Sequence, residues 1–566
     1  MIAGGRNGKN APNKKEKIMS VCEFLTVSSL DKVGSSARPA LLETENVMLQ
    51  NETLSFQIAM ACKEWDRRFC HVKVKGTIAK YVEVRYAELV PVSMPSKYDC
   101  DDYYITKDPT MLPDVLLPVT KEGFHIFDKQ WRALWITVRG KGEIPVGKHR
   151  LKFIFTGEGG EKLGETSYTV TVLDGVLPPQ KLLYTNWVHY DGICEYYRVK
   201  PFSAKFYSLT KSFLKTAAEH GMNVVYVPLF TPPLDTAVGG ERTTVQLIGV
   251  KKTAGGYEFD FSEFETFIAM CKELGYTHFE MSHLFTQWGA KAAPKIMAEA
   301  DGKQKRIFGW DTPSDGEEYV AFLTAFLPRL VAKMRELAID KNAFLHVSDE
   351  PNAADFEHFA KASALVRSLA EDIPFIDANS NLQSYLDGIS PHPIPATSEA
   401  EEFLPYHIPD MWVYYCSGQY NNYLSNRLMG MPSQRNRILG AQLYMNDVAG
   451  FLHWGYNFYE SFLSMHHLDP YARTDAGGAF QSGDSFIVYP DKNGALDSLR
   501  HEVLYDAFQD LRALQLLESK IGKDAVKEFL RGEGVKEGFH EYPRSAVWHA
   551  GLRRRIYELY FGKENV

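Results

Sequence analysis

Apolar and polar positions alternate with a period of two through the first third of the chain. Between about residues 20 and 175, runs such as ETLSFQIAM (52–60), YVEVRYAEL (81–89), RALWITVRG (132–140) and RLKFIFTG (150–157) are separated by glycine, proline and aspartate. Successive side chains of a strand point to opposite faces, so each run predicts a strand with one buried face. Short strands at this spacing, with little helical periodicity between them, predict an antiparallel β-sandwich.

The pattern changes after DGVLPPQ (174–180), where two consecutive prolines cannot continue a strand ladder. Apolar strand-like runs then alternate with amphipathic helical runs such as SLTKSFLKTAAEHGM (208–222), FSEFETFIAMCKELGY (261–276), YVAFLTAFLPRLVAKMREL (319–337) and FEHFAKASALVRSLAE (356–371); a longer run, 426–450, is also expected to be helical. The predicted strands are 182–188, 223–229, 277–283, 344–349, 374–378, 411–416, 451–456 and 485–489. This alternation predicts a (β/α)8 barrel with long insertions. A doubly wound open sheet stays open as the alternative, although no glycine-rich phosphate-binding turn follows any strand.

The predicted fold is therefore multidomain: an N-terminal antiparallel β-sandwich, then a (β/α)8 TIM-type barrel with C-terminal helices. A chain of 566 residues is too long for one ordinary core. We expect a disordered tail over 1–19, the sandwich over 20–177, the catalytic barrel over 178–497 and a helical extension packed on the barrel over 498–566.

Composition and charge narrow the classes of partner. The chain has 63 basic and 71 acidic residues and no long basic stretch in its folded part, which argues against a nucleic-acid partner. The seven cysteines are scattered without a CxxC pair or zinc spacing, so we expect reduced thiols and no metal. No apolar window long enough for a membrane helix and no signal-like leader occur, so we expect a cytoplasmic protein without a membrane partner. Nothing in the sequence supports or excludes an oligomer.

One stretch, FLHVSDEPN (344–352), carries two adjacent carboxylates at the predicted exit of the fourth strand. Barrel enzymes place their chemistry at this end of the strands. Alternation puts His346, Ser348 and Glu350 on the face toward the barrel lumen, and Pro351 disfavours a helix at Glu350. Asp349 can join Glu350 only if the strand breaks locally; otherwise it caps a helix or pairs with an arginine.

A pair of carboxylates is the basic equipment of glycoside hydrolysis. Adjacent carboxylates leave little room for the water of an inverting enzyme. They are better suited to a substrate-assisted scheme in which the glutamate is the acid/base and the aspartate stabilises the sugar's own 2-acetamido group as it attacks.

Several motifs together resemble one known family. HVSDEPN, YYCSGQYNN, GFLHWGYNFY and the block GDSFIVYP…GALDSLRHEVLYDAFQDLRAL resemble glycoside hydrolase family 123 and related glycoside hydrolase-like sequences that share an uncharacterised C-terminal domain. The resemblance covers roughly residues 180–520, with a β-sandwich in front of it as in the family. It implies a retaining β-N-acetylgalactosaminidase-type activity without a cofactor, with Glu350 as general acid/base and Asp349 as the acetamido-stabilising residue. Ala507 and Phe508 depart from the group's glycine and aliphatic residue, in a region expected to be structural.

Further polar and aromatic residues lie at predicted strand exits and are candidate substrate contacts: Trp187, His189, His283, Trp288, His346, Asn379, Tyr414, Tyr415 and Trp454. Aromatic faces stack on the C–H groups of sugars, and Trp454 is the preferred wall for the acetamido methyl group. Tyr414 and Tyr415 alternate, so only one can face the lumen. His346 is expected to support Glu350 through a hydrogen bond.

The sequence thus predicts a glycoside hydrolase that acts on a glycan or glycoconjugate, releasing β-linked N-acetylhexosamine with a preference for N-acetylgalactosamine. One alternative is a glycosidase of similar fold that acts on another sugar with an ordinary carboxylate pair, in which Glu280 or Asp377 is the second member. The other is a non-catalytic carbohydrate-binding protein.

Overall fold

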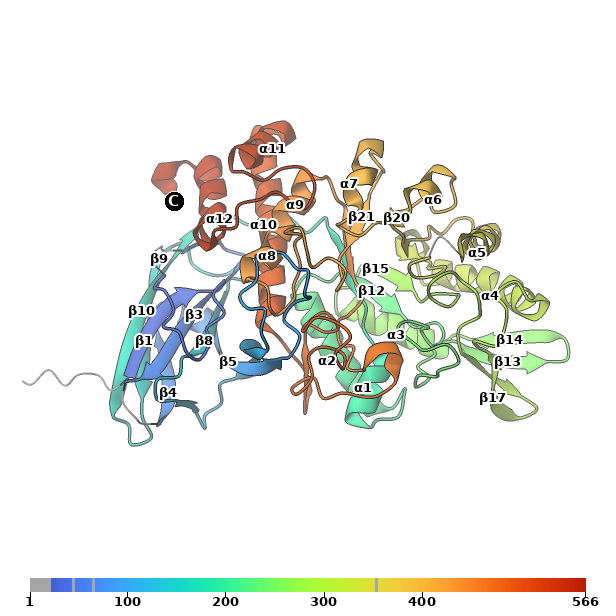
Figure 1. Cartoon of the computed structure of the whole chain (residues 1–566), viewed down its shortest axis with the longest axis horizontal. Helices are drawn as coiled ribbons and strands as arrows, with labels where there is room; N and C mark the ends of the chain where they lie inside the picture. The colour runs from blue at the N-terminus through green and yellow to red at the C-terminus, as the bar shows by residue number, and fades with distance from the viewer. Residues whose placement is uncertain (1–21, 43–45, 64–66, 352–354) are drawn as a thin grey trace, which may run out of the picture.

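The computed structural model describes residues 22–42, 46–63, 67–351 and 355–566, so the predicted tail over 1–19 lies outside the described residues. The N-terminal region consists of two five-stranded sheets (Figure 1, blue to teal). The first has the order β1 (Cys22–Ser28), β3 (Thr53–Cys62), β8 (Arg132–Arg139), β5 (Val82–Val92) and β6 (Thr110–Pro118). The second has the order β2 (Asn46–Leu49), β10 (Lys162–Leu173), β9 (Gly147–Thr156), β4 (Arg68–Lys75) and β7 (Phe124–Ile126). Every neighbouring pair is antiparallel except β2 and β10.

The two sheets pack face to face around an aromatic core. Phe56 of β3 meets Phe153 of β9 and Tyr168 of β10, with ring centroids 5.9 Å and 4.2 Å apart. Strand β9 keeps the predicted alternation, because its other face is open to solvent. Strand β3 is buried along its whole length, because the outer face of its sheet packs against Leu499 and Val503 of a C-terminal helix.

After the sandwich come eight short parallel strands: β11 (Leu183–Asn186), β12 (Val224–Val227), β15 (His278–Met281), β18 (Ala343–Phe344), β19 (Asp377–Ala378), β20 (Pro393–Ile394), β21 (Trp412–Tyr414) and β22 (Gly450–His453). They form three parallel ladders, β12–β15–β18, β19–β20 and β21–β22–β11. Single parallel bridges, Leu345 to Phe375 and Ala396 to Tyr414, lie between these ladders. The expected (β/α)8 barrel is therefore present in part, as a half-barrel of short parallel strands.

One of the predicted strands was wrong and one was missed. The run 485–489 is not a parallel strand; β23 (Tyr489–Asp491) forms an antiparallel hairpin with β24 (Gly494–Leu496). Its apolar side chains are buried without a parallel neighbour, and a short apolar run cannot by itself distinguish these cases. The parallel strand that was missed is β20, in the sequence HPIPA, where the prolines remove the usual strand signal.

Helices follow most of the parallel strands: α1 (Tyr190–Tyr197), α2 (Ala204–Glu219), α3 (Ser262–Glu273), α4 (Glu317–Glu336), α5 (Phe356–Leu369), α6 (Leu382–Leu386), α7 (Ala400–Phe403), α8 (Ser433–Arg437) and α9 (Leu439–Met445). The predicted helices at 208–222, 261–276, 319–337 and 356–371 match α2, α3, α4 and α5, whereas 426–450 holds only the short α8 and α9. Short 3-10 helices are η1 (Ala79–Tyr81), η2 (Asp340–Asn342), η4 (Leu404–Tyr406), η5 (Phe462–Ser464) and η6 (Lys563–Asn565). The main insertion is a four-stranded sheet in the order β14 (Gly256–Asp260), β13 (Gly249–Thr253), β16 (Ile296–Ala300) and β17 (Lys303–Phe308).

Three helices end the chain: α10 (Leu499–Ile521), α11 (Lys523–Gly532) and α12 (Ala546–Phe561). Ser498 is the N-cap of helix α10, and its hydroxyl accepts a hydrogen bond from the His501 N–H. It lies between the sandwich and the parallel strands (Figure 1) and packs against β3 and β6 on one side and α8 and α9 on the other. The helical extension thus contacts both parts of the molecule rather than the parallel-strand region alone.

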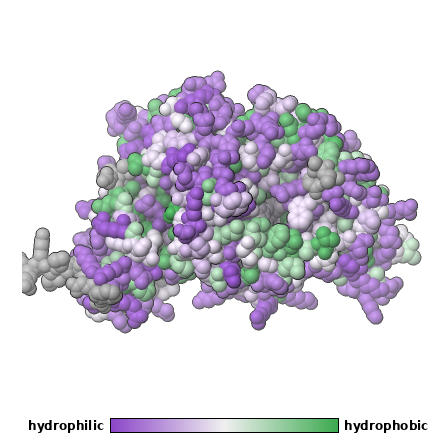
Figure 2. Space-filling view, viewed as in Figure 1, coloured by the Kyte–Doolittle hydropathy of each residue, from purple (hydrophilic) through white to green (hydrophobic). Residues whose placement is uncertain are grey.

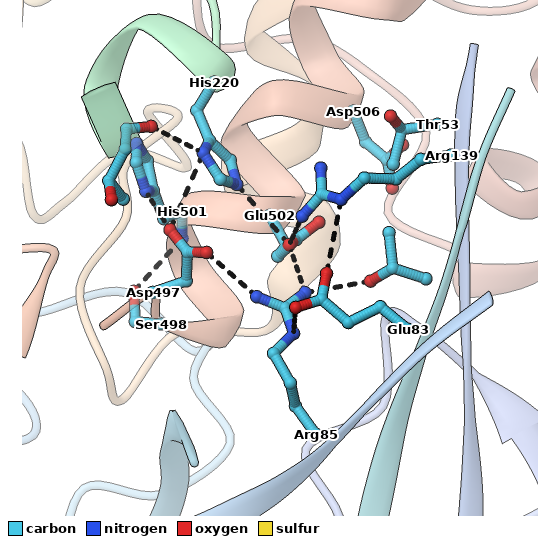
Figure 3. A network of polar contacts seen from close by, with 12 residues as sticks. Thr53, Glu83, Arg85, Arg139, His220, Asp497, Ser498, His501, Glu502 and Asp506 are labelled. Atoms are coloured by element: carbon cyan, nitrogen blue, oxygen red, sulfur yellow. Dashed lines mark hydrogen bonds and ion pairs between the residues drawn. The ribbon is translucent and has the colours of Figure 1, made fainter. Parts of the chain in front are cut away.

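A buried polar network, here called the junction network, joins the sandwich to α10 and to the end of α2 (Figure 3). Glu502 accepts hydrogen bonds from Arg85 of β5 and, at 3.3 Å, from Arg139 of β8. His220 Nε2 lies 3.4 Å from Glu502, and Arg85 also pairs with Asp497 at 2.9 Å. Burial alone would raise the pKa of Glu502, but Arg85 and His220 hold that pKa well below its ordinary value.

Figure 2 shows hydrophilic residues over most of one face of the molecule, with apolar residues gathered near its middle. Among the described residues, no helix is both long and apolar enough to cross a membrane.

Candidate active site

The loops that follow the parallel strands surround a pocket of about 170 Å³. Aromatic and aliphatic side chains form most of its wall, and four carboxylates line it: Asp235, Asp349, Glu350 and Asp484. No lysine, arginine or histidine of the described residues lines it. Such a pocket suits a neutral, hydroxyl-rich ligand with some apolar surface, because carboxylates accept hydrogen bonds from hydroxyl groups and repel anions.

The backbone breaks the strand pattern just before the Asp349–Glu350 pair. Strand β18 ends at Phe344, and only a single bridge follows it. The Asp349 carbonyl accepts a hydrogen bond from the Trp288 N–H at 2.7 Å, and the Glu350 N–H donates to the Ala378 carbonyl at 3.1 Å. Glu350 has a φ of 42°, in the left-handed region that a side chain rarely adopts. Because of this break, both carboxylates line the same pocket.

The two carboxylates differ in their surroundings. Asp349 is half-buried, and its withdrawal from water together with the neighbouring Glu350 carboxylate raises the pKa of Asp349 well above its ordinary value. Glu350 is exposed, and its Oε1 accepts a hydrogen bond from the Tyr414 hydroxyl at 2.7 Å. The negative charge of Glu350 therefore opposes ionisation of Asp349.

A fully buried charged group lies beneath the pocket. His346 is placed between Glu280, 2.5 Å from its Nε2, and Asp377, 3.3 Å from its Nδ1. Burial opposes a charge on His346, but these two carboxylates raise the pKa of His346 to about 9. The expectation that His346 bonds Glu350 is thus wrong. Glu280 also accepts the Trp187 indole N–H at 2.9 Å, and neither Glu280 nor Asp377 lines the pocket.

Among the described residues, two sets of side chains bring metal-ligand donors close together, and one of them, His283, His346 and Asp377, overlaps this buried group. It does not fit a metal. Both nitrogens of His346 face carboxylates, its raised pKa keeps it protonated, and the rings of His283 and His346 stack with centroids 4.3 Å apart. Stacked rings direct their lone pairs side by side rather than toward one point. The other set, His220, Asp497 and His501, has the same stacked arrangement at 4.0 Å.

Four of the predicted substrate contacts do line the pocket: Trp187, Trp288, Tyr414 and Trp454. Of the two adjacent tyrosines only Tyr414 faces it, as alternation requires. Tyr415 is fully buried on the other side against Phe451. The Trp454 indole is held in place by its N–H, which donates to Asp484 at 3.1 Å.

The remaining predicted contacts are buried behind the pocket wall and have partners there. His189 lies between the Trp454 carbonyl, 3.0 Å away, and Arg242. His283 is hydrogen-bonded to the Tyr226 hydroxyl, and Asn379 is hydrogen-bonded to Ser384 and to the Asn381 N–H. Together with His346 and Tyr415, these residues do not reach the pocket. A position at a strand exit brings a side chain to the same end of the strands as the pocket, but its contacts with neighbouring loops decide whether it lines the pocket.

Sequence reasoning missed several residues of the wall. Asp484 lies in GDSFIVYP, a motif that pointed to the family but not to the pocket, and Asp235 follows strand β12 in the loop PPLD. The motif around Asp484 and the predicted strand before Asp235 were the signals that could have identified these two residues as part of the pocket. Phe462 and Phe480 come from long loops after β22, and nothing in their sequence indicates that they lie beside the pocket.

A family model and two solved structures are similar to this chain. The family model described as "Glycoside hydrolase 123, catalytic domain" matches residues 187–517. A family 123 glycoside hydrolase from Clostridium perfringens, studied for glycolipid glycan hydrolysis, is 13% identical, with 96% of this chain and 99% of that chain covered and a TM-score of 0.73. A β-glucuronidase from Parabacteroides merdae is 10% identical, with 87% and 52% covered and a TM-score of 0.30. A search of curated proteins found no match.

Proposed function

This chain belongs to glycoside hydrolase family 123, and we propose that it releases β-linked N-acetylhexosamine, with N-acetylgalactosamine preferred, by a retaining mechanism that uses the sugar's 2-acetamido group. The observation that carries the proposal is the placement of Asp349 and Glu350, adjacent in sequence, on one pocket. Two carboxylates this close in the chain fit an acetamido nucleophile better than a water between them.

In the first step the acetamido carbonyl oxygen attacks the anomeric carbon and the glycosidic C–O bond breaks. Glu350, the more exposed of the two, gives its proton to the departing oxygen. The charge of Glu350 is one cause of the raised pKa of Asp349, and this cause is absent while Glu350 carries its proton. The ionised Asp349 then accepts the acetamido N–H and stabilises the positive charge that develops on the cyclic intermediate. Water then opens this intermediate from the opposite face, and Glu350 takes the proton of that water. Two inversions give net retention.

The pocket wall supports the same assignment. Tyr414 holds Glu350 by a hydrogen bond, and Trp187 and Trp454 provide apolar surface for the acetamido methyl group. The parallel ladders and the bridges between them support a (β/α)8-type barrel as the catalytic domain, with boundaries near 177/178 and 497/498.

Hydrolysis of aryl β-N-acetylgalactosaminide and β-N-acetylglucosaminide tests the activity directly. Glu350→Gln should lower kcat by about 10²- to 10⁴-fold on a substrate with a poor leaving group. Glu357→Gln, an exposed acid of α5 paired with Lys361, is the matched control and should keep wild-type activity. Full activity of Glu350→Gln would refute the acid/base role.

A thiazoline that mimics the cyclic intermediate distinguishes the mechanism from that of an ordinary carboxylate pair. It should compete with substrate in the wild type and bind more weakly to Asp349→Asn, because Asp349 is assigned to the acetamido nitrogen. An enzyme that cleaves the glycoside but has no affinity for the thiazoline would rule out acetamido participation.

A further inference from the structure

A third carboxylate, Asp235, lines the pocket in addition to the Asp349–Glu350 pair. It lies in the loop after β12 and is half-buried. Its charge is close enough to Asp349 to contribute to the raised pKa of that residue. The proposed reaction assigns Asp235 no role, although a half-buried carboxylate costs stability unless something offsets it.

Asp235 is fixed by hydrogen bonds from two other loops. Its N–H donates to the Gln287 side-chain oxygen at 2.5 Å, and its carbonyl accepts the Ser464 hydroxyl at 2.8 Å. Its carboxylate Oδ2 accepts the Leu463 N–H at 3.2 Å. These contacts tie together the loops that follow β12, β15 and β22. The side chain therefore has a defined position before any ligand arrives.

The backbone of Asp235 is also strained. Its φ is 40°, and two other residues that line the same pocket, Trp288 and Glu350, have φ of 64° and 42°. Non-glycine residues in this region are unfavourable and concentrate where a side chain must be aimed for function. Glycine, which has no Cβ, adopts this conformation without that cost.

Behind the loop, Arg242 forms a buried ion pair with Asp191 and donates to the Leu234 carbonyl at 2.9 Å. Burial raises the pKa of Asp235 to about 6, while Arg242 and the Leu463 N–H oppose that rise. Among the described residues, no cationic side chain forms an ion pair with Asp235, and its Oδ1 accepts no hydrogen bond. One carboxylate oxygen is thus held by the protein and the other is left for a ligand.

We propose that Asp235 binds a hydroxyl group of the sugar ring held in the pocket and helps to select the ring's configuration. This rests on the proposed function, which places an N-acetylhexosamine there. A sugar hydroxyl donates to Oδ1, while Oδ2 keeps its hydrogen bond to Leu463. An epimer that directs its hydroxyl elsewhere leaves this carboxylate without a donor, and a site built around a hydroxyl discriminates strongly for that reason.

An enzyme–substrate cycle tests the assignment. Wild type and Asp235→Ala are compared on aryl β-N-acetylgalactosaminide and on its 3-, 4- and 6-deoxy derivatives. Asp235→Ala should lower kcat/KM about 10- to 100-fold on the parent, as expected for a hydrogen bond to a charged group. On one deoxy derivative the same substitution should change kcat/KM by less than about threefold, because the shared contact is already gone. An equal loss on all four substrates would overturn the proposal and make Asp235 a structural residue.

Two further variants distinguish a lost ligand contact from a disrupted loop. Asp235→Asn retains an oxygen for the Leu463 N–H, so it preserves the loop if Asp235→Ala does not fold, and it should show the same non-additivity with a smaller loss. Glu241→Ala is the control, because Glu241 belongs to the same loop but pairs with Lys295 and does not line the pocket. Should the wild type hydrolyse no N-acetylhexosaminide, the proposed function fails. The same cycle, measured as Kd for the free sugar and its deoxy forms, then decides the role of Asp235 alone.

Discussion

Replacement of Glu502 by glutamine removes the central negative charge of the junction network. The carboxylate of Glu502 is 1% exposed and its Oε1 lies against two arginines, Arg85 and Arg139, and 3.4 Å from His220 Nε2. The neutral variant leaves these cations with fewer partners in a site that is largely closed to solvent. Asp497 still pairs with Arg85 at 2.9 Å.

Breaking a buried ion pair by removing one partner costs about 3–5 kcal/mol. Glutamine keeps one oxygen that can accept from Arg85, and Asp497 retains a negative charge nearby, so Glu502→Gln should lower the free energy of unfolding by about 3 kcal/mol. Glu83→Gln is the matched control. Glu83 contacts the same arginines, at 3.3 Å from Arg139, but is 47% exposed, and its loss should cost less than about 1 kcal/mol.

Urea unfolding followed by tryptophan fluorescence at pH 7 measures both variants, and the midpoint should move without a change in slope. The pH dependence gives a second measurement. Because the folded pKa of Glu502 is depressed, its stabilisation is present above the unfolded pKa and is lost as pH falls toward the folded value. Glu502→Gln should therefore lose less stability than wild type between about pH 5 and pH 3. Equal costs for Glu502→Gln and Glu83→Gln would refute the reasoning.

Two other predictions concern the pocket and the group beneath it. Tyr414→Phe removes the hydroxyl that donates to Glu350 and should lower kcat/KM on aryl β-N-acetylgalactosaminide by about tenfold. Circular dichroism should show an unchanged fold, and an unchanged kcat/KM would refute a role for this hydrogen bond in catalysis. The pKa of His346 is raised to about 9, so its stabilisation is complete below the unfolded pKa near 6.5 and is lost as pH rises through 9. The free energy of unfolding should fall by up to about 3 kcal/mol over that range, and Glu280→Gln should remove most of the dependence; the same slope in both proteins would contradict it.

The local pattern of apolar and polar residues predicted much of the fold, because an element with one buried face has apolar residues at regular intervals. The alternation of β9 and the helical periodicity of α2 to α5 each reflect one element with one buried face. The pattern failed where an element depends on partners far away in the chain. Strand β20 pairs through backbone groups despite its prolines, and the apolar run 485–489 is buried without joining a parallel ladder.

The same division holds for the pocket. Asp349 and Glu350 were found in the sequence because they are consecutive, follow an apolar strand and precede a proline. Whether both reach one pocket was decided by the left-handed backbone at Glu350 and by contacts from Trp288 and Ala378, which belong to other strand exits.

His346 and Asp235 show what the sequence by itself could not determine. Alternation put His346 on the same face as Glu350, but its partners, Glu280 and Asp377, come from two other strands and hold it beneath the pocket. Asp235 carries no motif, and it lines the pocket because loops more than fifty residues apart bind its backbone. Sequence determines which side of an element a residue occupies; its neighbours across the fold, brought together only when the chain closes, determine what it can bind.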